Sequence, residues 1–205
     1  MRAVILAAAA AVLVSGQPAP AAPAQRICRH VGDPEGDVTT VESMRPPGVT
    51  PDPSIDIVSA DLGVDARYVT AVVRFDDLSD RALDRRWDRF SFRAGGHTFE
   101  FEVLRWYPTA PPSTDTVSFS HVDQSQKTVL TVPAYTYDAS ADELRMSVPV
   151  ATTNAYVRIA KGTKVGSFTV VAERSYSVAV HEVFDDAENS RSWTVGTPSC
   201  VRPGP

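Results

Sequence analysis

The chain has 205 residues, of which 43% are hydrophobic and 22% are charged, and its formal net charge is −5 at pH 7. This length suits one domain with a core of its own. The mild acidity comes without any cluster of Lys and Arg, which argues against nucleic acid and anionic membranes as partners.

The start of the chain has the pattern of a secretory signal. Arg2 supplies a positive charge, the run Ala3–Val14 carries none, and two small-residue A-P-A sites follow. The apolar run is shorter than the about 20 residues that a transmembrane helix needs, and Pro18 interrupts it. We therefore predict a signal peptide at 1–24, one secreted extracellular domain at 25–205 and no membrane span, with an uncleaved anchor as the alternative.

Two cysteines, Cys28 and Cys200, stand near the two ends of the predicted mature chain. In an oxidising compartment we expect them to form a disulfide. The bond would close a loop of about 170 residues, for which the chain-entropy model gives on the order of 5 kcal/mol as an upper figure. Two separate thiols or a bridge between two chains are the alternatives.

The first part of the predicted domain, residues 25–54, is rich in Pro, Asp, Gly and Thr, which predicts a long surface segment and no strands. Beyond it, apolar and polar side chains alternate with a period of two, as in half-buried strands. The first two strands are predicted at 55–60 and 68–75, with a polar turn at 63–67 between them. In the second strand the residues expected to face the core are Val69, Ala71, Val73 and Phe75.

A tight reversal at Ala94-Gly95-Gly96 predicts a hairpin, in which Phe90 and Phe92 pair with Phe99 and Phe101 on the inner face. Their Arg and Glu neighbours should face water. Further strands are predicted at 117–121, 128–132, 144–150, 156–160, 167–172 and 177–183. Together these make about eight to ten strands and predict an all-β fold with little helix, an antiparallel two-sheet β-sandwich of jelly-roll or immunoglobulin-like type with its Arg, Glu and Asp residues outside.

No pattern typical of a catalytic site is visible. Gly166-Ser167 lacks the second glycine of a G-x-S-x-G nucleophile turn. The acid pairs Asp76-Asp77 and Asp185-Asp186 would point to opposite faces of a strand, so they do not converge as a glycosidase pair must. The sequence predicts a protein that is not an enzyme, with a small extracellular enzyme or enzyme-inhibitory protein, its site built from loops, as the alternative.

The four histidines give no sign of a metal site. They are dispersed along the chain without a ligand spacing, at His30, His97, His121 and His181. With both cysteines in a disulfide, zinc bound by thiolates is not expected either. Met146, which alternates with Leu144 and Val148, should lie in the core.

Five segments carry a family resemblance. They are D-P-E-G-D at 33–37, S-I-D-I at 54–57, F-D-D-L-S-D at 75–80, D-D-A-E-N at 185–189 and W-T-V-G at 193–196. In this order they resemble secreted β-sandwich modules related to the DOMON and family-9 carbohydrate-binding domains, including the C-terminal domains of some extracellular glucan hydrolases and proteases. The last two segments are similar to the closing turn and final strand of that group.

The resemblance implies a structural calcium where the opening loop meets the sandwich. The matching positions are Asp33, Asp37 and Asp56, and Asp186 could join them if the chain ends meet. Calcium takes six to eight oxygen ligands, often from one short loop. The alternative is an ordinary Asp-Pro turn.

Sugar-binding members of that group present paired aromatic side chains, and Tyr135 and Tyr137 would point the same way along an extended segment. The alternative is that these rings cover the end of the core. Altogether we expect a secreted, monomeric, non-enzymatic binding or cell-surface interaction domain with an extracellular glycan or cell-wall component as ligand. Calcium is the one cofactor expected, and no haem.

Overall fold

The computed structural model describes residues 30–34, 38–40, 53–78, 85–106, 115–124, 126–176, 181–197 and 201–205. The predicted signal peptide, both cysteines and Asp37 lie outside these residues. The described part is an antiparallel β-sandwich, as predicted, with one short 3₁₀ helix, η3 (Val150–Thr153). No helix in it is both long and apolar enough to span a membrane.

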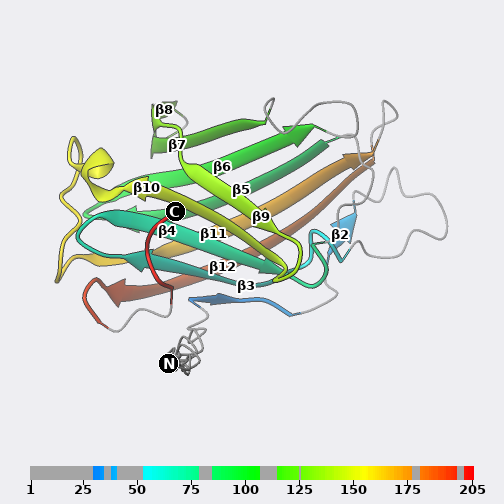
Figure 1. Cartoon of the computed structure of the whole chain (residues 1–205), viewed down its shortest axis with the longest axis horizontal. Helices are drawn as coiled ribbons and strands as arrows, with labels where there is room; N and C mark the ends of the chain where they lie inside the picture. The colour runs from blue at the N-terminus through cyan, green and yellow to red at the C-terminus, as the bar shows by residue number, and fades with distance from the viewer. Residues whose placement is uncertain are drawn as a thin grey trace, which may run out of the picture.

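Two sheets form the sandwich, and in Figure 1 they overlie one another. The five-stranded sheet has the order β1 (Val31–Gly32), β3 (Ile57–Val64), β4 (Tyr68–Phe75), β10 (Glu143–Pro149) and β9 (Ala134–Asp138). The seven-stranded sheet has the order β2 (Thr39–Thr40), β12 (His181–Thr194), β11 (Lys164–Tyr176), β5 (Arg85–Ala94), β6 (His97–Trp106), β7 (Thr116–Asp123) and β8 (Gln126–Thr131).

The predicted hairpin is formed by β5 and β6. Gly95 and Gly96 connect the two strands with positive φ angles of 57° and 87°, as a two-residue turn of the primed type requires. Along β5 every second residue is buried, which is the period of a strand with one face on the core. His97 directly follows the turn as the first residue of β6.

The core lies between the sheets and contains a group of stacked phenylalanines from β5, β6 and β7. Phe99 lies 5.6 Å from Phe92 and 5.8 Å from Phe119, and Phe101 lies 4.6 Å from Phe119, measured between ring centroids. The four residues of β4 predicted to face inward are buried, and Met146 is fully buried. These placements confirm the period-two prediction.

Strand β3 is covered on its outer side by the C-terminal residues, which Figure 1 shows crossing the five-stranded sheet. Gly204 donates its N–H to Thr70 Oγ1 and accepts a hydrogen bond from Ser147. A Cβ built on Gly63 would lie 2.8 Å from the carbonyl oxygen of Val201. Glycine at position 63 therefore lets the end of the chain lie directly on the strand.

Several strand predictions were wrong in detail. Residues 156–160 form no strand, because the Thr153 carbonyl and hydroxyl hold this segment in turns through Tyr156 and Val157. Residues 185–189, predicted as a turn, lie inside β12, where they pair with β11. The sequence also missed β9 and the short strands β1 and β2, which lie within residues 25–54, where no strands were predicted. Strand β3 extends to Val64 into the predicted turn.

Candidate functional site

The acids predicted to hold calcium are only partly brought together. Asp33 follows β1 and donates its N–H to Val58 O, while Asp56 is buried just before β3. Asp186 is exposed on β12; its neighbour Asp185 is buried and accepts a hydrogen bond of 2.6 Å from Ile57 N. Neighbouring residues of a strand face opposite ways, so Asp185, and not Asp186, reaches the segment after Asp56. Within the described ranges, no three His, Cys, Asp or Glu side chains are set to hold a metal ion.

Calcium binding at the opening loop stays a prediction, and thermal unfolding tests it. If the loop holds calcium, the ion at about a hundred times its dissociation constant should add about 2.7 kcal/mol of stability, which a chelator removes. Asp37→Ala should abolish this difference, whereas Asp186→Ala should leave it intact because Asp186 faces solvent. Identical melting curves with calcium and with chelator would exclude the ion.

Tyr135 and Tyr137 lie on β9, and their hydroxyl groups bind acids between the sheets. Tyr137 donates to Asp88 Oδ2 at 2.5 Å, and Tyr135 donates to Asp115 Oδ2 at 2.8 Å. The two rings are 6.1 Å apart and nearly perpendicular, at 85°. Rings at this angle do not form one flat surface for a sugar, and their placement favours the alternative that they close the end of the core.

The interior beside these tyrosines is charged, which corrects the expectation that Arg and Asp residues lie outside. Arg86 and Asp88 are 3% and 2% exposed and form a bidentate pair, with N···O distances of 2.7 and 2.9 Å. Arg86 also donates to Ser54 O at 2.6 Å, and Arg174 donates to Ser54 Oγ. Burial, reinforced by the charge of Asp88, raises the pKa of Tyr137 well above its ordinary value. These contacts are internal, so the group joins the two sheets.

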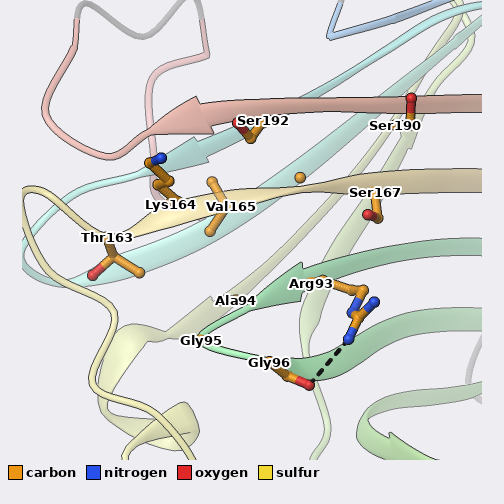
Figure 2. Close-up of a pocket in the computed structure, with 11 residues that line it drawn as sticks. Arg93, Ala94, Gly95, Gly96, Thr163, Lys164, Val165, Ser167, Ser190 and Ser192 are labelled. Atoms are coloured by element: carbon orange, nitrogen blue, oxygen red, sulfur yellow. Dashed lines mark hydrogen bonds between the residues drawn. The ribbon is translucent and has the colours of Figure 1, made fainter.

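An open hollow lies at the other end of β5, on the outer face of the seven-stranded sheet (Figure 2). We call it the serine hollow; its volume is about 560 Å³, and its polar and floor residues are Arg93, Lys164, Gly166, Ser167, Ser190 and Ser192. The turn Gly95-Gly96 closes one side of it.

Gly166 forms the floor of the serine hollow. Strand pairing places Ser192, Gly166 and Arg93 in one row across β12, β11 and β5, and the middle position has no side chain. A Cβ on Gly166 would lie 2.6 Å from the carbonyl oxygen of Arg191, closer than real Cβ atoms approach. Glycine therefore both permits the close pairing of β11 with β12 and leaves the hollow open.

A β-bulge follows the floor. The pairing of β11 shifts its register after Gly166, and Ser167 has a positive φ of 50°, which is uncommon for a residue other than glycine. Bulges turn a side chain to a new direction and are frequent next to functional sites. In Figure 2 Ser167, Ser190 and Ser192 lie along β11 and β12, with the Arg93 side chain below them on β5.

The lining has the chemistry of binding. It offers two cationic side chains and several hydroxyl groups, while none of the described residues around it is His, Asp or Glu. A serine nucleophile needs a neighbouring base to remove its proton. The serine hollow thus presents groups that hold a polar ligand, and it shows no pair set for nucleophilic or acid–base catalysis.

Two histidines that the sequence left dispersed come together through the β5–β6–β7 pairing. His97 Nδ1 and His121 Nε2 are 3.2 Å apart, and the His121 ring stacks on Tyr156 at 3.8 Å between centroids. His121 is opposite Phe99 in the pairing of β6 with β7. His97 lies two residues before Phe99 on the same inner face, so the two histidines are diagonal neighbours. Their contacts fasten the segment after η3 to the sandwich.

None of the described residues that the sequence predicted to form a site lines the serine hollow. These residues lie elsewhere; they are Asp33, Asp56, Tyr135, Tyr137 and Asp186. The resemblance to DOMON and family-9 carbohydrate-binding domains stays a prediction. In comparisons with known proteins, no family model matches the chain, and neither a curated protein nor a solved structure matches it.

Proposed function

We propose that the protein is a secreted, non-enzymatic domain that binds an extracellular glycan in the serine hollow. The observation that carries the proposal is the row Ser192–Gly166–Arg93, in which a side-chain-free floor lies between a hydroxyl and a guanidinium. Sugars are recognised by many convergent hydrogen bonds, and this row supplies donors on both sides of an open floor.

The size of the hollow agrees with a short stretch of glycan. Adjacent strands are about 4.8 Å apart, so the outer two residues of the row stand about 10 Å from each other across β11. This span accommodates one or two sugar rings. The openness of the site toward solvent suits a chain that runs across the sheet and continues on both sides.

One set of oligosaccharides distinguishes a binding protein from an enzyme. The purified mature protein should bind members of a panel of neutral and acidic cell-wall oligosaccharides and should release no product on long incubation. Ser192→Phe, which fills the hollow from an exposed position, should weaken binding at least tenfold, or about 1.4 kcal/mol.

The matched control is Thr128→Phe, an exposed position on the edge strand β8 outside the hollow. It should bind like the unmodified protein and unfold at the same denaturant concentration as Ser192→Phe. Binding that survives Ser192→Phe would place the glycan elsewhere. Release of a cleaved product would replace the proposal with an enzyme.

A further inference from the structure

We infer that the serine hollow selects an acidic sugar, whose carboxylate or sulfate group lies between Arg93 and Lys164. This inference rests on the proposed function and adds the chemical class of the ligand. The lining carries two cationic side chains and, among the described residues around it, no acid, although the whole chain has a net charge of −5. A basic site on an acidic protein is a local feature that calls for an anionic ligand.

Both cations are available to a ligand. Arg93 and Lys164 are exposed, and neither forms an ion pair with a residue in the described ranges. The Arg93 guanidinium has one long contact of 3.5 Å, to the carbonyl of Gly96, drawn as a dashed line in Figure 2. A carboxylate or sulfate ester would be a far stronger partner, because its oxygens accept two parallel N–H donors from one guanidinium.

Acids on the same face of the sheet are bonded or farther away. Glu100 and Glu102 on β6 each lie 2.6 Å from the Lys127 ammonium, and Ser91 donates to Glu100 at 3.0 Å. The exposed acid Glu188 lies on the same face of β12 as Ser190, two residues before it, and does not line the serine hollow. The anionic group is thus expected near the row of Gly166, and Glu188 should oppose it weakly.

The lining also explains why a neutral sugar would bind less well. Neutral sugars gain much of their affinity from stacking on flat aromatic rings, and no aromatic residue is among the described residues of the hollow. Hydrogen bonds from exposed hydroxyl groups compete with water and add little on their own. Charge pairing is the contribution that the hollow offers beyond these bonds.

Isothermal titration with three trisaccharides of one sugar series tests the inference: galactotriose, its sulfate ester and trigalacturonate. We expect at least one acidic trisaccharide to bind tenfold or more tightly than galactotriose, with an affinity that falls as salt screens the pair. Arg93→Gln and Lys164→Gln should each weaken acidic binding about threefold to fivefold, since exposed ion pairs are individually weak. The double variant should bind the acidic and the neutral trisaccharides with equal affinity.

Two further variants make the test specific. Arg158→Gln removes an exposed cation outside the hollow and should change nothing, whereas Glu188→Gln should strengthen acidic binding. Equal affinity of the unmodified protein for neutral and acidic trisaccharides, or a preference for the acidic ones that persists in the double variant, overturns the inference and leaves glycan binding in place. Inorganic sulfate that binds as tightly as the acidic trisaccharides overturns it as well. Absence of binding by the whole oligosaccharide panel overturns the proposed function itself.

Discussion

Replacing Asp88 with Ala should cost about 3 to 5 kcal/mol of unfolding free energy, which is typical of removing one partner of a buried ion pair. Asp88 accepts two hydrogen bonds from the Arg86 guanidinium and one from the hydroxyl of Tyr137. Without it, a cation that is 3% exposed loses its two hydrogen bonds to a carboxylate while it stays between the sheets. Loss of the negative charge beside this buried cation is what lowers the stability.

Matched variants separate the charge effect from packing. Tyr137→Phe removes one hydrogen bond and should cost about 1 to 2 kcal/mol. The double variant Arg86→Met/Asp88→Leu removes both charges and should be markedly more stable than Asp88→Ala, because a buried pair replaced by apolar residues is often tolerated. Urea unfolding measures the change in unfolding free energy for Asp88→Ala, Tyr137→Phe and the double variant, provided that the m-value stays unchanged. A loss below about 1 kcal/mol for Asp88→Ala would contradict a large contribution of this ion pair to stability.

The fold was predictable because it follows from local alternation. Phe90 and Phe92 on β5 face the core, and Ser91 between them does not. The same alternation also places Arg86 and Asp88 on the inner face. The sequence analysis missed them because it assigned charged residues to the solvent side, a rule that fails where each charge finds a partner inside.

The more distant partners of this buried polar group could not be found from local patterns. Ser54 and Arg174 are 120 residues apart in sequence and meet only when the two sheets pack together. The serine hollow has the same origin, since Arg93, Gly166 and Ser192 share a row through the register of three strands. Gly166 was visible as a glycine beside the predicted strand 167–172, and a glycine in a strand often marks a bulge. The sequence analysis considered Gly166-Ser167 only as an incomplete nucleophile turn.

The disulfide predicted between Cys28 and Cys200 should be the other large contribution to stability. The cysteines lie outside the described residues, but residues close to each of them in sequence meet at β3. His30 donates its N–H to Asp61 Oδ1 at 2.9 Å and accepts one from Leu62 N at 3.1 Å. Val201 is buried and lies against Gly63, the residue of β3 that follows Leu62. Its carbonyl oxygen would be 2.8 Å from a Cβ atom added to Gly63.

These contacts support a bond within one chain. Its removal in Cys28→Ser/Cys200→Ser should lower the unfolding free energy by up to about 5 kcal/mol, since the bond constrains nearly the whole unfolded chain. Reductant should shift the urea midpoint of the unmodified protein and leave that of the double variant unchanged, with thiol titration giving no free thiol before reduction. Two free thiols in secreted material, or a dimer that reductant separates, would contradict the bond. In that case the contacts of His30 and Val201 with β3 would have to hold the chain ends by themselves.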